Sequence, residues 1–423
     1  MPRTPRGLAW VLAAILAAGA CARGDVAPMG AGDRPYTPDP DERALVARAE
    51  REQEALLGRI RTHDDRALAR YLGAVVARLH PAGAAGAPAP TVTVVRDPTL
   101  SAFALPTGRI FLHTGLLAAL ENEAQLATIL AREITHVTHR HALRSEREAR
   151  GTRALSRMAE MAANLGLAVA AETAPGGAAS AVLSETANAI LGLRLPLATV
   201  AAVQGHGRDL EREADREGIE RLVKAGYAAG EARTAFERLL AARRERGPVE
   251  VFFLGSQARL RERVDSAKAI VAGKFAAAAA GPGRVTDTAD FRERVRVAVR
   301  DNAHEDLRLG RFELARAQLA RVLAAAPDDP VAHLYDGDLR RLQAQRARSA
   351  GERASLLRDA LERYTRAARL DPDFADPYRQ LGLLHYQERD RERARAAFER
   401  YVALRPDAPD VPRIREYLAE LGR

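Results

Sequence analysis

The 423-residue chain contains one cysteine, Cys21, and only three lysines, Lys224, Lys268 and Lys274. A single cysteine cannot form an internal disulfide, and once the N-terminus is processed no cysteine remains to ligate a metal. After Leu8–Ala20, no apolar run reaches the roughly 20 residues of a membrane-spanning helix. The formal charge of +9 comes from arginines dispersed among glutamates rather than from basic blocks. We therefore expect no nucleic-acid partner.

The most informative absence is that of one histidine. Residues 131–141 read Ala-Arg-Glu-Ile-Thr-His-Val-Thr-His-Arg-His and match the zinc-peptidase pattern H-E-x-x-H, except that Arg132 replaces the first histidine. In the intact pattern, two histidines on one helix face bind Zn²⁺ and the glutamate polarises water. Glu133 and His136 are in place. Arginine, however, cannot ligate a metal.

The helix that carries this motif is predicted independently of it. Leu126, Leu130, Ile134 and Val137 recur at three- and four-residue spacing, and Asn122 is a suitable N-cap before them. A bare E-x-x-H pair on such a helix is weak evidence, because Glu and His are ordinary surface residues. Its meaning depends on the neighbouring segments.

Two further segments complete an ordered set of motifs. Ser101–Leu117 reads as a turn, a short β-strand and the start of a helix, and Glu211–Gly218 opens an amphipathic stretch with the pattern E-x-x-A-D. Together these motifs resemble the gluzincin family of CAAX prenyl endopeptidases and HtpX-type proteases, with its periplasmic TPR-bearing members nearest. The likeness runs from about Asp41 to Val264. It implies an α+β fold, with a mainly helical metallopeptidase-like domain and a small β-sheet.

The resemblance also implies roles for individual residues. Glu133 would be the general base, and His136 and Glu211 would be zinc ligands, with Asp215 orienting the ligand shell. Zinc is the cofactor expected for the family, but its retention here is in doubt. The strand formed by Arg109, Ile110, Phe111, Leu112 and His113 resembles the family's edge strand, which binds substrate peptides by β-augmentation. An ordinary edge strand is the alternative.

A second departure from the family lies downstream. The family has His-Pro followed, six residues after the His, by an arginine. Here Arg263 remains, whereas Gln257 and Ala258 replace the His-Pro pair. Buried carboxylates need a compensating cation, so we expect Arg132 to pair with Glu211 in place of zinc. Metal binding by an altered set that includes His139 is the alternative.

The N-terminus indicates an envelope location. Arg3 and Arg6 precede the apolar run, which is typical of a signal peptide. The run ends at Cys21 in a pattern that resembles a bacterial lipobox, and Ala22 favours the outer membrane over the inner one. Cleavage by ordinary signal peptidase, giving a soluble periplasmic protein, is the alternative. We expect a signal peptide over 1–21, a flexible tether over 22–40 and a metallopeptidase-like domain over 41–285.

Residues 290–423 contain a repeat. Pro327, Pro372 and Pro406 each follow a helix with an alanine and a large apolar residue twelve and eight positions before the proline. The pairs are Ala315 and Leu319, Ala360 and Tyr364, and Ala394 and Phe398. This is the TPR pattern of about 34 residues, whose stacked helices present a concave binding surface. The longer spacing before Pro372 fits a loop or a helix extension around Gln343–Ser355, and a purely architectural role is the alternative to binding.

The sequence therefore predicts an envelope-tethered member of a zinc-metalloendopeptidase family with a degenerate pocket, acting mainly by binding. The resemblance implies unfolded or outer-membrane protein clients and envelope assembly proteins bound through the TPR groove, with membrane contact through a lipid anchor. The opposed hypothesis is an active zinc endopeptidase with an altered ligand set. Retention of Glu133, His136, Glu211 and Asp215 favours activity, whereas the losses at positions 132 and 257 oppose it.

Overall fold

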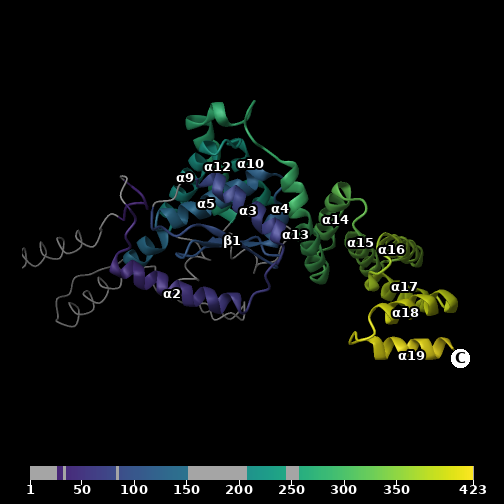
Figure 1. Ribbon diagram of the computed structural model, residues 1–423. Helices are drawn as coiled ribbons and strands as arrows, with labels where there is room; N and C mark the ends of the chain where they lie inside the picture. Colours follow the sequence, from purple (N-terminus) through teal and green to yellow (C-terminus); the bar gives the residue numbers. More distant parts are fainter. Residues whose placement is uncertain (1–25, 32–34, 82–84, 151–206, 244–256, 423) are drawn as a thin grey trace, which may run out of the picture. The chain divides into compact units, whose positions relative to one another are not determined.

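The computed structural model describes residues 26–31, 35–81, 85–150, 207–243 and 257–422 (Figure 1). Two compact units are present, one extending to Thr288 and the other comprising Ala289–Arg423 with Arg96–Pro98. The first is mainly helical with a small sheet and the second is a helical array, which confirms the predicted fold class. No helix in the described ranges is both long and apolar enough to cross a membrane. Cys21, at which lipidation is predicted, lies outside the described residues.

The first unit surrounds a three-stranded sheet with helices. Its strands are β1 (Thr91–Val95), β2 (Ala102–Ala104) and β3 (Arg109–His113). Its helices are α2 (Pro40–Leu57), α3 (Arg66–Leu79), α4 (Thr114–Ala119), α5 (Glu123–Thr138), α9 (Arg208–Lys224), α10 (Gly230–Arg243) and α12 (Gln257–Lys274), with a 3-10 turn at η1 (Ala276–Ala278). Residues 141–150 are also helical.

The strand order corrects one prediction. β3 is the central strand of the order β1-β3-β2, pairing in parallel with β1 and antiparallel with β2. The prediction that Arg109–His113 is an edge strand is therefore wrong, because Thr91–Val95 pairs with its second side. The edges of this sheet are β1 and β2, and β2 contacts α5.

Both faces of the sheet are covered. Figure 1 shows α2 on one side of the sheet and α3 and α5 on the other. Ile110, Phe111 and Leu112 are consecutive and fully buried, as alternating side chains require in a sheet packed on both faces. On the α2 side, Leu56 joins Phe111 and Phe103, whose rings stack at 5.0 Å. The sheet is thereby fixed between α2 and α5.

The segment before α2 is docked where the structure describes it. Val26 is buried, and the backbone N–H of Met29 donates to the carbonyl oxygen of Thr138 at 2.8 Å. The backbone N–H of Tyr36 donates to the carbonyl oxygen of Ala85 at 2.9 Å. These residues therefore differ from the flexible tether expected over 22–40.

The second unit is built from paired antiparallel helices. They are α13 (Ala289–Arg308), α14 (Phe312–Ala325), α15 (Pro330–Ala344), α16 (Ala350–Leu370), α17 (Ala375–Gln387), α18 (Arg391–Leu404) and α19 (Val411–Leu421). All six residues of the predicted alanine and apolar pairs are buried, which confirms the repeat pattern. The longer second repeat is explained by α16, a helix of 21 residues. Of the two alternatives for the extra length, the helix extension is the one observed.

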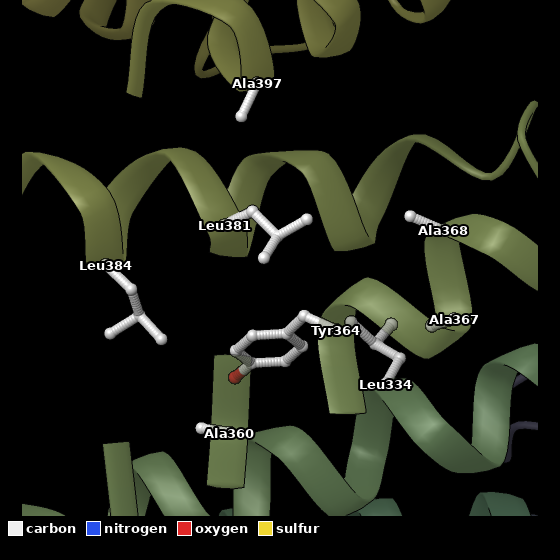
Figure 2. Close-up of a cluster of buried hydrophobic side chains, with 8 residues drawn as sticks. All are labelled: Leu334, Ala360, Tyr364, Ala367, Ala368, Leu381, Leu384 and Ala397. Atoms are coloured by element: carbon white, nitrogen blue, oxygen red, sulfur yellow. The ribbon is translucent and has the colours of Figure 1, made fainter. Parts of the chain in front are cut away.

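The hydrophobic core of the second repeat is built around Tyr364. Figure 2 shows its ring among Leu334 of α15 and Leu381 and Leu384 of α17. Its hydroxyl donates to Oδ1 of Asp338 at 2.8 Å, which satisfies the one polar atom of a fully buried side chain. Tyr364 thus links two successive repeats.

Close helix packing in the third repeat depends on Gly382. A Cβ at this position would collide with the ring of Phe398, which is fully buried. We expect Gly382→Ala to destabilise the repeat unit by about 1–3 kcal/mol, the usual cost of overpacking. Gly351→Ala is the matched control, because a Cβ at this position would meet no atom within 4 Å, and it should be neutral or slightly stabilising. Urea denaturation measures both, and equal midpoints would contradict the prediction.

Candidate functional site

Helix α5 carries the motif through the centre of the first unit. Asn122 caps it by accepting a hydrogen bond from the N–H of Gln125 at 2.9 Å, which confirms the predicted N-cap. Nearly every residue of α5 is buried. The helix ends before Arg140, whose φ of 55° is left-handed and turns the chain into the helical residues 141–150.

The side chain of Arg132 lies among three carboxylates. Its two terminal nitrogens donate to Oε1 of Glu133 and Oε2 of Glu211. Its Nε lies 3.2 Å from Oδ1 of Asp215. Only 13% of the arginine side chain is exposed, so these are largely desolvated contacts. The predicted pairing with Glu211 is present, and the contacts with Glu133 and Asp215 add to it.

Asp215 is held from its other side by Arg263. Nε and one terminal nitrogen of Arg263 donate to the two carboxylate oxygens of Asp215 at 3.0 and 2.8 Å. The guanidinium carbon of Arg263 lies 4.2 Å from the ring centroid of Phe236, a cation–π contact. A bidentate pair of this kind fixes the orientation of the carboxylate. Asp215 and Arg263 therefore lie together at the site.

The retained histidine faces the same site. Nε2 of His136 is 3.8 Å from Oε1 of Glu211, and its Nδ1 is 2.9 Å from Nδ1 of His141. The rings of the two histidines meet edge to face at 4.9 Å. The sequence did not identify His141 as this partner. The turn at Arg140 returns His141 to the end of α5, and nothing in residue spacing alone indicates that turn.

A glycine permits α9 to approach α5. A Cβ on Gly218 would lie 3.2 Å from both the N and Cα atoms of Arg132. The two helices therefore pack with backbone against backbone at the motif. This approach brings Glu211 and Asp215, both on α9, within reach of Arg132.

The charges at the site are mutually dependent. Burial alone would lower the pKa of Arg132, but Glu211, Glu133 and Asp215 together raise it above the ordinary arginine value. Burial raises the pKa of Glu133 to about 7, although Arg132 acts to lower it. Arg132 is thus fixed as a cation, and its charge is what makes the adjacent carboxylates tolerable in the interior.

These residues do not fit a catalytic zinc ion. Such an ion takes three protein ligands and a water molecule, whereas a guanidinium here contacts the carboxylates around the first ligand position. Within the described ranges, no group of three or more His, Cys, Asp or Glu side chains is placed to hold a metal. His139, the alternative ligand, ends α5 with its pKa lowered by burial. Gln257 begins α12, and its side chain lies outside the described part.

The E-x-x-H pattern on the buried helix α5 faces the E-x-x-A-D pattern on α9. This arrangement is typical of the metallopeptidase class, although in this chain arginine occupies the first ligand position. Residues 66–276 match the model of Peptidase family M48, and residues 346–419 match a Tetratricopeptide repeat model. The chain belongs to peptidase family M48 and carries TPR helices later in the sequence than the family domain.

Several curated relatives match part of this chain. A Vibrio cholerae protein assigned as a beta-barrel assembly-enhancing protease is 36% identical over 35% of this chain and 28% of its own length. The Beta-barrel assembly-enhancing protease of Escherichia coli K12 is 29% identical over 35% of this chain and 27% of its own length. The Mitochondrial metalloendopeptidase OMA1 of Schizosaccharomyces pombe is 33% identical over 38% of this chain and 40% of its own length. The chain thus spans between 27% and 40% of the length of these three relatives.

Proposed function

We propose that this protein is a non-proteolytic member of peptidase family M48 that binds unfolded or outer-membrane proteins during their assembly or quality control. The observation that carries the proposal is the position of Arg132, whose guanidinium contacts Glu133, Glu211 and Asp215. A guanidinium that contacts these carboxylates would repel a zinc ion bound by the same carboxylates, because both are positively charged. The names of the bacterial relatives suggest β-barrel proteins as the clients.

The TPR array supports a binding role. Stacked TPR helices form extended surfaces suited to peptides and partner proteins, and α13–α19 supply such a stack. Envelope assembly proteins are the partners we propose for it. A purely architectural array would leave partner binding unchanged when its surface is altered.

We also propose a periplasmic location with an anchor in the outer membrane. The support lies in the sequence, where Leu8–Ala20 has the length of the hydrophobic region of a signal peptide and Cys21 follows it at a small-residue cleavage point. Attachment of a lipid there would provide the membrane contact.

Zinc content and hydrolysis test the proposal together. We expect the purified full chain to hold less than one equivalent of zinc in elemental analysis. We also expect Glu133→Gln to leave any residual cleavage of casein unchanged, because Glu133 is engaged by Arg132. Stoichiometric zinc with hydrolysis abolished by Glu133→Gln would instead establish an active endopeptidase with an altered ligand set.

Arg132→His provides the complementary gain-of-function test. It restores a ligand-capable side chain beside His136 and Glu211 and removes the competing cation, so zinc affinity should rise above that of the parent. Arg132→Gln is the matched control, since it removes the same cation without supplying an imidazole ligand. Equal zinc binding by the two variants would show that the lost histidine is not the main defect.

A further inference from the structure

A pocket beside His136 is closed on one side by α2. The pocket lies between α2, the end of β2 and the end of α5. Its lining includes Leu45 and Val46 of α2, Leu105 and Pro106 after β2, and His136 and Val137 of α5. The lining is mainly apolar, with His136 as one of its few polar members. A polypeptide reaching this pocket from the α2 side has to displace α2.

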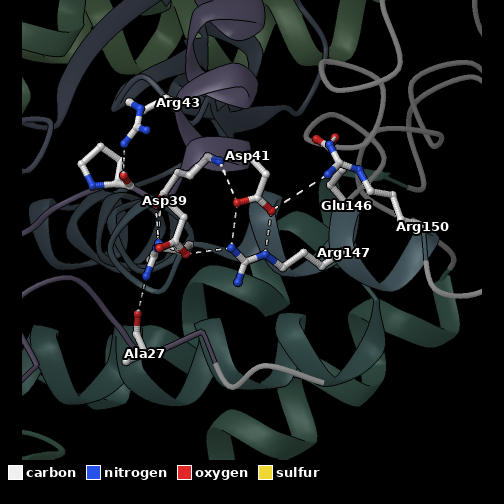
Figure 3. A network of polar contacts seen from close by, with 10 residues as sticks. Ala27, Asp39, Asp41, Arg43, Glu146, Arg147 and Arg150 are labelled. Carbon is white, nitrogen blue, oxygen red and sulfur yellow. Dashed lines mark hydrogen bonds and ion pairs between the residues drawn. The ribbon is translucent and has the colours of Figure 1, made fainter. Parts of the chain in front are cut away.

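The first turn of α2 is held in place by charged side chains. Arg147 donates to Oδ2 of Asp39 at 2.7 Å and contacts both oxygens of Asp41 at 2.8 and 2.9 Å. Arg140 donates to both oxygens of Glu42. Figure 3 shows Arg147 between Asp39 and Asp41. Arg140 lies in the turn after α5 and Arg147 in the helical residues 141–150 that follow, so these contacts join α2 to the segment after the motif helix.

The two ends of α2 differ in what buries them. At its C-terminal end, Leu56 belongs to the apolar cluster on the sheet with Phe103 and Phe111. At its N-terminal end the apolar contact is small, with Leu45 packed against Val26 and Leu143. Apolar burial resists salt, and so does the pair of Arg140 with Glu42, whose side chains are 12% and 4% exposed. The pairs of Arg147 with Asp39 and Asp41 are more exposed, and salt screens them more strongly. The N-terminal end is therefore the one that charge controls.

The family comparison sets α2 apart from the domain it covers. The match to Peptidase family M48 begins at residue 66, nine residues after α2 ends at Leu57. Helices α5 and α9, with Arg132 and Glu211, lie inside the matched range. Helix α2 thus lies outside it and closes a pocket formed largely within it.

We propose that α2 is a charge-latched strap, fixed at its C-terminal end on the sheet and released at its N-terminal end when the contacts of Arg140 and Arg147 are lost. Release uncovers the apolar pocket beside His136 for an extended segment of a client protein. The part that concerns clients rests on the proposed function. The opening of the strap itself does not.

The labelling rate of a single introduced thiol measures how readily the strap opens. In the full chain with Cys21→Ser, Ala104→Cys places one thiol in the pocket lining at a residue that is buried. Adding Arg147→Glu replaces attraction to Asp39 and Asp41 with repulsion. We expect maleimide to label this thiol faster by on the order of tenfold, since the ion pairs of Arg147 with Asp39 and with Asp41, each of modest strength, are lost together and replaced by repulsion. Adding Asp41→Arg recreates an opposite-charge pair and should restore slow labelling.

The control is Arg43→Glu on the same helix. Arg43 is exposed and donates to the carbonyl oxygen of Pro38, so its reversal changes the charge of α2 without touching Arg147. Its labelling rate should equal that of the parent. Equal rates for Arg147→Glu and the parent would overturn the proposal.

Two further measurements distinguish local opening of the strap from a folding defect of the variants. Raising the salt from about 0.1 M to 1 M shortens the Debye length from roughly 10 to 3 Å and should accelerate labelling of the parent without any latch substitution. Amide exchange should rise in the N-terminal half of α2 while α5 stays protected. Salt-independent labelling, or exchange that rises equally in α5, would contradict a local strap. Because labelling involves no client, its outcome is independent of the proposed function.

Discussion

Arg132→Ala is expected to destabilise the first unit by about 3–5 kcal/mol, the usual cost of removing one partner from a buried ion pair. The substitution leaves Glu133, Glu211 and Asp215 without the guanidinium that contacts all three. Arg263 still holds Asp215, so Glu133 and Glu211 account for most of the loss. Urea denaturation followed by circular dichroism measures it.

Two variants sharpen this test. Arg233→Ala removes an exposed pair with Glu237, whose side chains are 45% and 41% exposed, and should cost under about 1 kcal/mol. Arg132→Lys keeps the charge without the planar fork, so its stability should fall between that of Arg132→Ala and the parent. A loss for Arg132→Ala as small as that for Arg233→Ala would mean that the Arg132 head group is solvated.

Tyr364→Ala should destabilise the second unit by about 3–5 kcal/mol, as expected for truncating a fully buried aromatic side chain. The ring packs against both α15 and α17, so its loss opens a cavity between two repeats. Differential scanning calorimetry or urea denaturation measures the change.

Two matched variants separate the contribution of the Tyr364 ring to stability from that of its hydroxyl group. Tyr364→Phe keeps the ring, and Arg341 still contacts Asp338 at 3.3 Å, so the cost should be near 1 kcal/mol. Leu309→Ala, at a side chain that is 54% exposed, should change stability by less than about 0.5 kcal/mol. Similar losses for Tyr364→Ala and Leu309→Ala would contradict a core role for Tyr364.

The sequence predicted the elements whose signals are local. Asn122 before an apolar helix identified the start of α5, and alanine with an apolar residue before each proline identified the repeats. These two features need no knowledge of how distant segments pair. The pairing of Arg132 with Glu211 is a distant contact, and it was expected only because the family resemblance places both residues at one metal site and buried carboxylates need a cation.

Non-local pairing accounts for what the sequence did not predict. The place of Arg109–His113 in the sheet depends on β1, which lies many residues earlier and has no motif of its own. The docked segment before α2 depends on Thr138, whose carbonyl oxygen accepts from Met29. The contact between His136 and His141 depends on the left-handed turn at Arg140. In each case the partner is defined by the folded chain rather than by residue spacing.

The position of Arg132 bears on how such a site can arise. A histidine codon becomes an arginine codon through one base change, so loss of the ligand and arrival of the replacement cation coincide. No ancestor has to pass through a stage in which Glu133 and Glu211 are buried without a counter-charge. In the proposed function the arginine takes the place of the metal, and because ribosomal synthesis supplies it, the domain would mature without drawing on a supply of metal.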